Sequence, residues 1–566
     1  MTRCVRVVTE NAAVDRAFDY EVPTALSSVQ VGDRVRVDFN HRSLRGWVTA
    51  EVEPTREMKA VKKWLGLGPA PEMLPLLEWA AHRWCAPLSR FLLAASPRVV
   101  VAQVPLAPVA RPLDATVAAL AVRREPGVVL VAPTHDPLAL IVHAYQSTLD
   151  SPGSLLVLVP TEAWALRLRG RLEQRGCAVA QGEGEWNRMR AGWPVIVGAR
   201  GAALAPTPRV RAAVIVDADD EAYRSASSPT WDATTMLRER CRRDGAPLWL
   251  TSVAPSPTLM SLGPVRVTDD VTGGWPRVSI VDRREGDPHD GVLTQSALAV
   301  AHRALDGEEP VALVVILQRL GHGRLFACRR CGELARCGVC GMAEVESGEG
   351  VACVHGHDPR ANFCRSCGAT NLKKVRVGVS TLARDVAAQL SQPVNEVVAS
   401  STAEITARVV VGTEAVFARV RRCAAVVFVD FDQYLLAPRE SARRAALVAV
   451  AKAGRLVGSR REGRGVVLIQ TRRHDEVIDA LASGDVVALL EEDVATAQAL
   501  GLPPYGARAE ISGEAAPEFV ERLRQPEVRV RHVEGVYVVS ARDIETLTAA
   551  LSETPRPAGR LRIEVY

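Results

Sequence analysis

Seven of the twelve cysteines fall between positions 328 and 367, and their spacing is that of metal ligands. Three Cys-x-x-Cys pairs stand there, each followed directly by glycine: Cys328/Cys331, Cys337/Cys340 and Cys364/Cys367. Such a glycine lets backbone amides approach the two sulfur atoms, as in zinc knuckles. A four-thiolate zinc site uses two pairs, so the third pair needs further ligands. Cys353, with His355 and His357 beside it, is the candidate for that role.

These residues predict two zinc ions, one held by four cysteines and the other by three cysteines and a histidine. The alternatives are disulfides and scattered core cysteines. Disulfides need an oxidising compartment, whereas the chain opens directly into an alternating strand pattern with no signal peptide. We therefore expect a reducing cytoplasm and zinc, in sites that are most often structural.

The composition indicates a multi-domain globular protein. A chain of 566 residues suffices for about three to five domains. Its 48% hydrophobic and 24% charged residues are ordinary for folded proteins. No apolar run approaches the length of a membrane-spanning helix. The net charge of +5 permits nucleic-acid binding without requiring it.

The elements that position these residues begin with a β-rich region. Short alternating stretches with Gly and Pro breaks predict a β-domain over residues 1–60. Apolar residues at helical spacing from Met73 to Ala95 predict two helices, in a winged-helix-like unit over residues 61–105. A Pro/Ala/Val-rich linker follows.

From position 127, short apolar stretches alternate with helical ones, which predicts parallel sheets covered by helices. We expect an α/β protein with two such lobes, at 115–265 and 275–485, arranged as a two-lobed nucleotide-binding motor. The cysteine-rich segment, 326–372, is an insertion in the second lobe. Residues 490–566 predict a small C-terminal α+β domain.

A phosphate-binding loop is expected after the first strand of lobe one, but the residues that it needs are missing. The loop from Ala132 to Leu138 has no glycine and no lysine, and its two prolines remove amide donors. None of the chain's six lysines precedes Ser or Thr, so there is no Gly-Lys-Ser/Thr motif. Arginine fits poorly where a point charge is wanted, because its guanidinium is a planar fork.

The second expected element, an acidic cluster ending an apolar strand, is present in altered form. Asp217 stands where a metal-coordinating carboxylate would, but the next position, usually a water-activating glutamate, is Ala218. Acidic loops are also common at strand ends of α/β folds. A relic of an ATPase site and a plain surface loop are therefore equal alternatives.

Taken in order, the segments resemble the PriA family, also called primosomal protein N′ or replication-restart helicase, in the shortened and degenerate form of actinobacteria. The opening stretches RAFDYEVP and VGDRVRVDF are similar to that family's Phe-Asp-Tyr and Gly-x-Arg-Val segments. TSVAPSPT and VVVGTEAVF are similar to its later helicase motifs. The resemblance covers nearly the whole chain and implies two RecA-like helicase lobes with a two-zinc insertion.

In that family, the N-terminal domain captures the terminal nucleotide at the 3′ end of a nascent DNA strand. The resemblance assigns this role to Phe18, Asp19, Tyr20 and Lys59. The aromatic rings would stack on the terminal base, Asp19 would accept from its sugar hydroxyl, and Lys59 would hold a phosphate. The alternative is that Phe18 and Tyr20 are plain core residues. Asn40 replaces a glycine that the family has beside the pocket.

The resemblance also implies a nested order of zinc ligands. The outer pairs, Cys328/Cys331 and Cys364/Cys367, would hold one ion, and Cys337, Cys340 and Cys353 the other. The family's eighth cysteine is Gly356 here, so either His355 or His357 would complete the second site.

Several helicase motifs of the family are altered. The Gly-Ser-Gly-Lys-Thr loop is absent, Asp217-Ala218-Asp219-Asp220 replaces Asp-Glu-Glu-His, and the five residues from Gln318 to His322 replace Asn-Arg-Arg-Gly-Tyr. Asp217, Asp220 and the arginine-finger candidate Arg455 would be relics of a catalytic site. The resemblance therefore implies a helicase-like protein that does not hydrolyse ATP, and it leaves the binding of ATP and Mg²⁺ open.

These inferences predict a replication restart protein that recognises stalled or branched forks and D-loops, and promotes primosome assembly and replicative helicase loading. The implied partners are branched DNA, primosome proteins and the replicative helicase, with single-stranded DNA-binding protein as a further candidate and no membrane. It would act in the cytoplasm, at the nucleoid. The alternatives are an active ATP-dependent 3′–5′ DNA helicase with a divergent phosphate loop, and a zinc-stabilised protein-interaction scaffold.

Overall fold

The computed structural model describes residues 3–11, 16–54, 58–268, 271–285, 291–318, 326–339, 344–347, 350–353, 357–370, 372–374, 378–437, 440–523, 525–533 and 535–566. The chain divides into two compact units. Unit 1 comprises Met1–Val129, Asp136–Arg266 and Asp493–Tyr566, and unit 2 comprises Leu130–His135 and Val267–Glu492. None of the helices in the described ranges combines the length and apolarity that crossing a bilayer requires.

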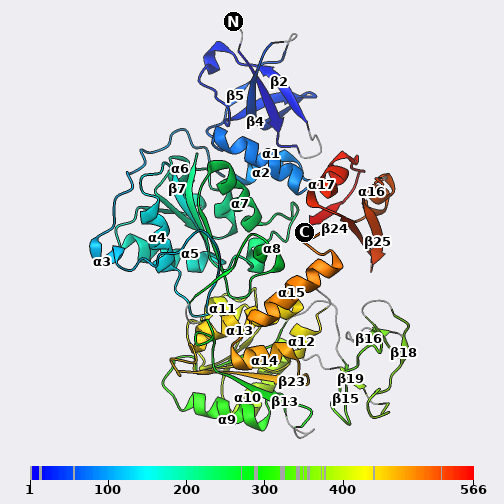
Figure 1. The fold of residues 1–566 in the computed structure, drawn as a ribbon. Coiled ribbons are helices and arrows are strands. Elements are labelled where there is room, and N and C mark those ends of the chain that lie inside the picture. The colour runs from blue at the N-terminus through cyan, green and yellow to red at the C-terminus, as the bar shows by residue number, and fades with distance from the viewer. Residues whose placement is uncertain are drawn as a thin grey trace. The chain divides into compact units, whose positions relative to one another are not determined.

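Unit 1 begins with a five-stranded antiparallel sheet in the order β2-β1-β4-β3-β5 (Figure 1). Its strands are β1 (Cys4–Thr9), β2 (Ala17–Glu21), β3 (Arg34–Phe39), β4 (Arg42–Val52) and β5 (Lys63–Trp64). Alternate residues face inward, so that Val5, Val7 and Val35 are fully buried. Asn40 and His41 close the β3–β4 hairpin with φ angles of 45° and 61°. Tight hairpins need such left-handed residues, and Asn adopts them readily, so Asn40 makes the turn that a glycine would make.

Two helices follow this sheet, α1 (Leu74–Arg83) and α2 (Leu88–Ala94). Trp84, between them, is buried and packs edge-on against Trp79 and against Trp231 of the first lobe. The two helices expected from the sequence are therefore part of the core beneath that lobe. Residues 98–113 form neither helix nor strand, so the β-hairpin that would complete a winged helix does not follow α2.

The first lobe is a seven-stranded sheet in the order β12-β6-β11-β10-β7-β9-β8, with parallel pairing from β11 to β8. Its strands are β6 (Gly127–Leu130), β7 (Ser154–Leu158), β8 (Val179–Gln181), β9 (Val195–Gly198), β10 (Val210–Ile215), β11 (Leu248–Ser252) and β12 (Arg266–Val267). Its helices are α3 (Ala115–Ala118), α4 (Leu138–Ser147), α5 (Glu162–Glu173), α6 (Trp186–Arg190), α7 (Ala233–Asp244) and α8 (Pro257–Met260). All residues of β7, β9 and β10 are buried, because α4 and α5 cover one face and α7 with the N-terminal helices covers the other.

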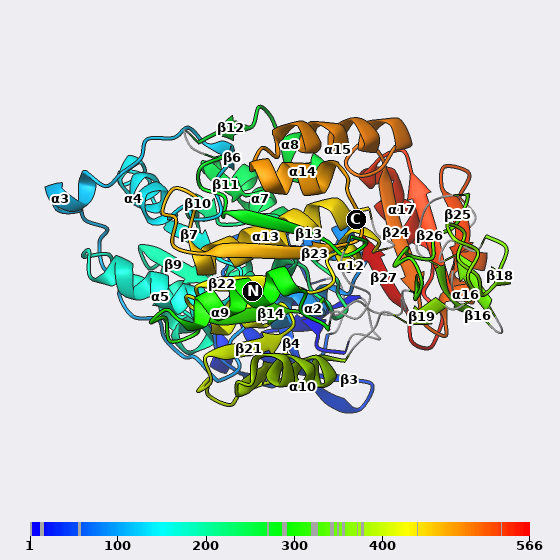
Figure 2. The same ribbon diagram turned by 90° about the horizontal axis from the view of Figure 1, so that it is seen from below.

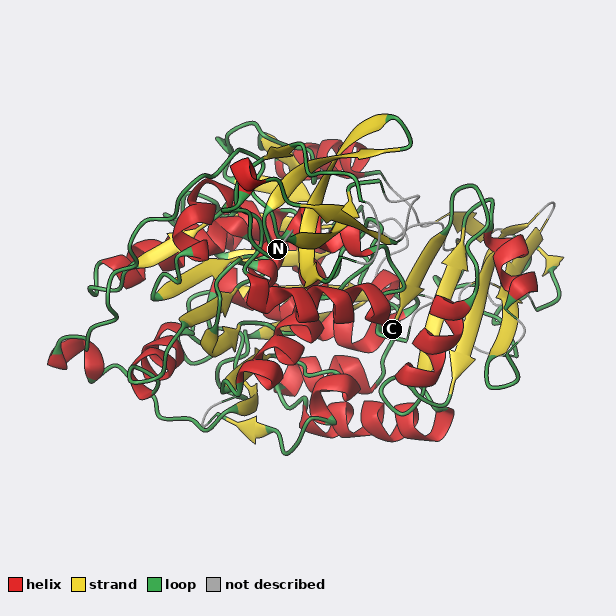
Figure 3. Cartoon of the chain, turned by 90° about the horizontal axis from the view of Figure 1, so that it is seen from above, coloured by secondary structure: helices red, strands yellow, loops and turns green. Residues whose placement is uncertain are grey.

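The last part of unit 1 is a four-stranded antiparallel sheet in the order β25-β26-β24-β27, with both of its helices on one face (Figure 3). Its elements are β24 (Ala507–Ser512), α16 (Ala516–Arg522), β25 (Arg529–Val533), β26 (Val536–Ala541), α17 (Ile544–Glu553) and β27 (Arg562–Val565). This βαββαβ order is ferredoxin-like. The domain is joined to lobe 1, since the Thr230 hydroxyl donates to the Ile563 carbonyl at 2.9 Å.

Unit 2 is built on a six-stranded sheet in the order β13-β23-β22-β14-β21-β20, whose neighbouring strands are all parallel (Figure 2). The strands are β13 (Val278–Asp282), β14 (Leu313–Ile316), β20 (Val394–Val397), β21 (Val409–Gly412), β22 (Ala425–Phe428) and β23 (Val466–Thr471). The helices are α9 (Gln295–Leu305), α10 (Val379–Leu390), α11 (Val416–Arg419), α12 (Asp432–Leu435), α13 (Ala442–Val457) and α14 (Glu476–Ser483). Helix α15 (Val487–Leu500) begins in unit 2 and continues into unit 1 from Asp493. Helices α9 and α10 bury alanines and leucines against one face of the sheet. The prediction of two parallel-sheet lobes is confirmed.

The cysteine-rich insertion leaves the second lobe after β14 and forms two small sheets. In the first, β15 (Phe326–Cys328) pairs with β19 (Leu372–Lys374). In the second, β16 (Glu344–Ser347), β17 (Gly350–Cys353) and β18 (Arg360–Ala361) lie side by side. Apart from cysteines, its buried apolar cluster holds only Phe326, Ala335, Val351 and Leu372 among the described residues. So small a core needs another source of stability, such as metal ions.

Candidate metal centre and DNA-binding face

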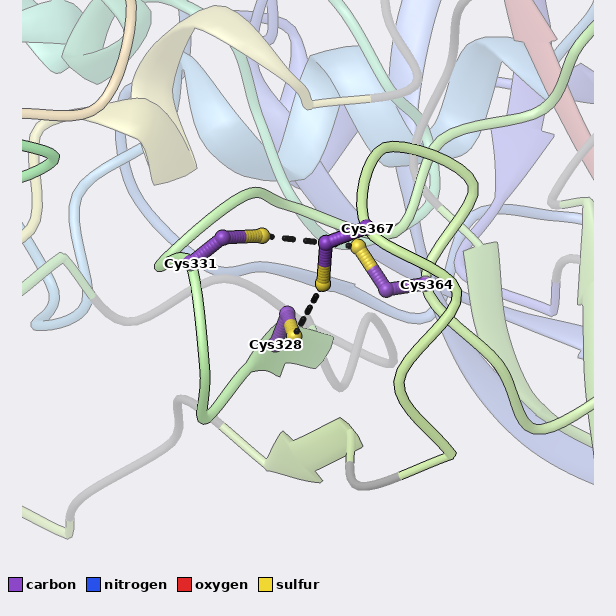
Figure 4. A group of neighbouring side chains, drawn as sticks. All are labelled: Cys328, Cys331, Cys364 and Cys367. Carbon is purple, nitrogen blue, oxygen red and sulfur yellow. Dashed lines mark hydrogen bonds between the residues drawn. The ribbon is translucent and has the colours of Figure 1, made fainter.

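Four cysteine sulfur atoms converge at one point of the insertion (Figure 4). Cys328 ends β15 and Cys331 follows it in a turn, while Cys364 and Cys367 lie in a second turn before β19. All four Sγ atoms lie within 4.8 Å of one another. The Sγ atoms of Cys328 and Cys367 are 3.5 Å apart, and those of Cys331 and Cys364 are 3.6 Å apart.

Both turns have the backbone geometry of a zinc knuckle. Gly332 and Gly368, which directly follow the second cysteine of each pair, have φ angles of 74°, a conformation that favours glycine. The Arg330 amide donates to the Cys328 sulfur at 3.3 Å. Amides aimed at sulfur stabilise thiolates, which are the form that binds metal.

The distances fit zinc ligation and exclude disulfides in this arrangement. A disulfide joins its sulfur atoms at about 2.0 Å, whereas all four cysteines are free thiols. Tetrahedral zinc, with bonds of about 2.3 Å to sulfur, separates its ligands by about 3.8 Å. Burial raises the pKa of Cys331 to about 12, while the Ala369 backbone amide lowers the pKa of Cys367 to about 7. Four thiols this close need a cation to ionise together, so the residues fit a zinc ion.

A second group of possible ligands consists of Cys337, Cys353 and His357. Cys353 ends β17, and the Sγ atom of Cys337 lies 3.4 Å from Nδ1 of His357. The Val339 amide donates to the Cys337 sulfur at 3.4 Å, as in the first knuckle. His357, one of the two histidines left open by the sequence, lies with these cysteines. Cys340 and His355 lie outside the described residues.

The part of the chain that the structure describes thus holds two groups able to bind metal, one with four thiols and one with two thiols and an imidazole. Sites of sulfur and nitrogen ligands without an open position are structural. Zinc in them would supply folding energy to the insertion. The second sheet adds an ion pair between Arg360 and the buried carboxylate of Glu344, which ties β18 to β16 across the intervening β17.

The N-terminal sheet carries the residues predicted to bind DNA, and the structure separates them. Phe18, on β2, is half-buried, and its ring centroid lies 4.6 Å from that of Phe39 at the end of β3. The guanidinium of Arg16 lies over the Phe18 ring, 4.9 Å from its centroid. Aromatic rings with a neighbouring cation are the usual platform for a nucleobase and its phosphate. Sequence reasoning missed Phe39 and Arg16. Their contacts with the Phe18 ring form only when the ends of β2 and β3 come together in the folded sheet.

Tyr20 does not offer a ring to a base, which corrects its predicted role. It is 3% exposed within the core of the β-domain, and its hydroxyl donates to the Asp38 carbonyl at 3.1 Å. Asp19 points to the opposite side of β2 from Phe18, because successive side chains of a strand alternate. There it pairs with Arg6 of β1, with 2.9 Å between Nε and Oδ1. Lys59 is exposed.

The loop expected to bind phosphate is occupied by the protein's own groups. Asp136 accepts from the Leu138 amide at 3.1 Å, at the start of α4, and pairs with Arg171 with 2.9 Å between Oδ1 and Nη1. A helix N-terminus that would otherwise attract a phosphate therefore already holds a carboxylate. The cation that completes this arrangement, Arg171, comes from α5 and pairs with Asp136 alone in the described contacts.

The acidic loop after β10 is held in place by hydrogen bonds. Asp217 is buried and has a φ angle of 52°, which is unusual for a residue with a side chain. Asp219 accepts from the Ser252 hydroxyl at 3.2 Å and from the Ser256 amide at 2.9 Å, and Asp220 accepts from the Ala222 amide at 2.9 Å. Asp219 therefore ties this loop to the one after β11, and Asp220 caps the short turn that begins at Glu221, two roles that need no metal or nucleotide.

The remaining relic candidates lie in unit 2. Arg455, on α13, donates from Nε to the Pro133 carbonyl at 2.9 Å, so it contacts the altered phosphate loop itself. Gln318 is buried at the end of β14, whereas the residues 319–322 that complete that motif lie outside the described residues.

Two solved structures resemble parts of the chain. The first is DUF1998 helicase MrfA bound to DNA and AMPPNP, with a TM-score of 0.35, 12% identity and coverage of 73% of this chain and 57% of that one. The second is RecG bound to a three-way DNA junction, with a TM-score of 0.36, 10% identity and coverage of 66% and 44%. These similarities carry no functional argument.

The sequence comparisons are more specific. Residues 6–97 match a family model described as the 3′DNA-binding domain (3′BD) of PriA. The replication restart protein PriA of Treponema pallidum is 30% identical over 172 residues, which span 28% of this chain and 25% of that protein. The probable replication restart protein PriA of Mycobacterium bovis is 26% identical over 592 aligned positions, covering 91% of this chain and 87% of that protein. Over nearly its whole length the chain is therefore similar to probable replication restart proteins PriA, and residues 6–97 match that family's 3′ DNA-binding domain.

Proposed function

We propose that the protein is a DNA-structure-binding replication restart factor that does not unwind DNA with ATP. It recognises stalled or branched forks and D-loops, and it promotes primosome assembly and loading of the replicative helicase. The observation that carries the proposal is the match of residues 6–97 to a 3′ DNA-binding domain. The half-buried ring pair of Phe18 and Phe39, with Arg16 above it, supplies chemistry for a terminal nucleotide there.

The loss of motor activity is supported by several independent changes at the nucleotide loops. Phosphoryl transfer is catalysed mainly by positioning and by charges, with lysine and Mg²⁺ foremost. The loop has no lysine, and Ala218 stands where a second carboxylate would. Asp136 puts a negative charge where the phosphates would bind. Each change weakens nucleotide binding or turnover by a different route, so no single compensation restores both.

A fork-binding assay with an ATPase control tests the proposal. The probes are a fork carrying a nascent-strand 3′ end at the branch and the same fork without that end. We expect wild type to prefer the first, and Phe18→Ala to lose that preference by roughly 5- to 150-fold, the loss of about 1–3 kcal/mol of base stacking. Asp19→Ala is the matched variant, because Asp19 lies on the same strand but faces away from the ring pair.

Each outcome separates the alternatives. If Asp19→Ala and Phe18→Ala lost the preference for the 3′ end equally, Asp19 would be part of the 3′-end pocket after all. Equal weakening of both forks by Phe18→Ala would overturn the 3′-end assignment. ATP-dependent strand separation that Asp217→Asn abolishes would overturn the non-motor proposal and favour an active helicase. Absence of salt-dependent DNA binding by the wild type would leave a protein scaffold held by its zinc insertion.

A further inference from the structure

Three positive side chains stand directly opposite one another across neighbouring strands of the N-terminal sheet. Arg45 of β4 pairs in register with Arg36 of β3, and Arg36 pairs on its other side with Lys63 of β5. Directly opposed residues of antiparallel strands have their Cβ atoms about 5 Å apart, and like charges in that position are destabilising. The sheet therefore carries a row of cations, Arg45–Arg36–Lys63, at some cost to its own stability.

This basic row faces the outside of the β-domain. Arg36 lies between Val35 and Val37, both fully buried in the core, so its side chain points the other way. Arg36 and Lys63 are exposed. The row is thus on the side of the sheet opposite to the core, away from the ring pair of Phe18 and Phe39.

Some neighbouring cations of the same domain are neutralised by acidic side chains, whereas two members of the row are not. Lys62 pairs with Asp38 at 2.5 Å, and Arg6 pairs with Asp19 at 2.9 Å. Within the row, only Arg45 has such a partner, Glu10 at 2.7 Å. Among the residues that the structure describes, Arg36 and Lys63 have no acidic side chain in ion-pair contact. Two adjacent charges without partners give this face a positive potential that attracts a polyanion.

The form of the row favours the backbone of duplex DNA. Adjacent strands lie about 4.8 Å apart, so three of them span about 10 Å, which is the axial rise of about three nucleotides of one strand. The paired residues of the row are all Arg or Lys, with no aromatic ring in register with them. Unpaired bases need rings to stack on, whereas the bases of a duplex arm stack on one another and its phosphates face outward.

We propose that Arg36 and Lys63, with Arg45 beside them, form a second DNA contact that holds the phosphates of a duplex arm. This inference rests on the proposed function and extends it, since the ring pair would read the 3′ end while the basic row holds the adjoining duplex. The contact is independent of sequence and of the strand end, because phosphates carry neither kind of information.

The test is fork binding by Arg36→Ala/Lys63→Ala over a range of salt concentrations. We expect weaker binding to every probe with a duplex arm, and a slope of log K against log salt that is shallower by about two. Preference for the 3′ end should persist, and single-stranded probes should be affected less. Arg36→Lys/Lys63→Arg keeps both charges and should bind as wild type does. Arg303→Ala/Arg384→Ala, on exposed positions of α9 and α10 in unit 2, is matched in charge and should leave the slope unchanged.

The outcomes distinguish this inference from the proposed function. If wild type binds forks and the double alanine variant binds with the same affinity and slope, the basic row does not touch DNA and the proposed duplex contact is overturned. If the control pair changes the slope equally, the effect is one of net charge and the assignment fails. If wild type binds no DNA, both the proposed function and this contact are overturned. Circular dichroism and zinc content identify a double variant that has misfolded, and the charge-preserving pair then decides between these outcomes.

Discussion

The four-cysteine cluster and the start of helix α4 are both places where a ligand is expected, and they differ in what the protein puts there. At the cluster, four sulfur atoms converge with distances of 3.5 and 3.6 Å that suit tetrahedral zinc. At α4, the carboxylate of Asp136 accepts from the Leu138 amide and pairs with Arg171. The first place is built from groups that only a cation can satisfy together. The second is already satisfied by its own neighbours.

This difference gives a physical criterion for a kept site and a lost one. A kept site gathers several groups of the same kind, which repel one another or lack partners unless the ligand is bound. A lost site pairs opposite groups, so that a ligand would have to displace internal contacts before it could bind. By this criterion the zinc insertion keeps its chemistry. The phosphate loop, and the acidic loop in which Asp219 and Asp220 accept internal donors, have the features of lost sites, in agreement with the non-motor function that we propose.

The largest expected effect comes from removing one member of the converging group. Cys331→Ser should lose one of the two proposed zinc ions and unfold the insertion, because metal binding in small modules supplies on the order of 10–16 kcal/mol of folding free energy. The two lobes should persist, since each has its own buried sheet. Metal analysis after dialysis, with limited proteolysis to locate cleavage within 326–374, measures both effects.

Cys423→Ser is the matched control for that experiment. Cys423 is a buried thiol of the second lobe outside both ligand groups. It should retain the wild-type zinc content and resist cleavage in the insertion. Wild-type protein with one ion or fewer would contradict the two-site arrangement, and a Cys331→Ser protein with unchanged metal content would show that the cluster is not a ligand site.

Much of this contrast follows from the sequence, and the part that does not is tertiary. The spacing of Cys328, Cys331, Cys364 and Cys367 predicts knuckles because ligand turns are local, and the apolar stretches predict both parallel lobes. Spacing alone left His355 and His357 open, because the approach of a side chain to Cys337 is a tertiary contact, which the described residues show for His357. Sequence could not separate Tyr20 from Phe18 either, because both lie on the inward side of β2 and only their depth in the core differs.

A smaller effect is expected in the second lobe, where two neighbouring aspartates are buried. Asp430 and Asp432 follow β22, and burial, followed by the charge of Asp430, raises the pKa of Asp432 to about 6. Asp430 is also buried, and its Oδ1 atom has no hydrogen-bond partner in the described structure. Arg472 faces both carboxylates, at 3.7 Å from Asp430 and 3.9 Å from Asp432, so the pair is held by charge while one oxygen of Asp430 accepts no hydrogen bond.

The sign of the pH effect follows from the raised pKa. An unfolded aspartate titrates near 3.9, so the native state holds the Asp432 proton to higher pH. The stability that this tighter proton binding by Asp432 contributes is complete below about pH 4, and it is lost as the pH rises through about 6. Asp432→Asn removes this dependence, so its unfolding free energy should gain about 1–3 kcal/mol over wild type between about pH 4 and about pH 7. Urea unfolding across that range measures the gain, and Asp306→Asn, at an exposed carboxylate after α9, should show none.

The smallest expected effect tests the lost site directly. Asp136→Ala removes the acceptor for the Leu138 amide and the partner of Arg171. An exposed ion pair contributes about 0–1 kcal/mol, and a side-chain acceptor at a helix start about 0.5–2 kcal/mol, so unfolding of lobe 1 should become easier by about 1 kcal/mol. Asp150→Ala, which removes an exposed carboxylate in the same lobe, should change stability by less than about 0.5 kcal/mol.

Affinity for a fluorescent ATP analogue, measured alongside, should stay at the level of background in both variants, because the loop still lacks lysine and still has two prolines. A stability loss without a change in nucleotide binding is the outcome expected of a carboxylate that holds α4 in place. ATP binding that appears once Asp136 is removed would mean instead that a working phosphate site lies beneath that side chain, and the contrast between the two regions would then be one of masking rather than of loss.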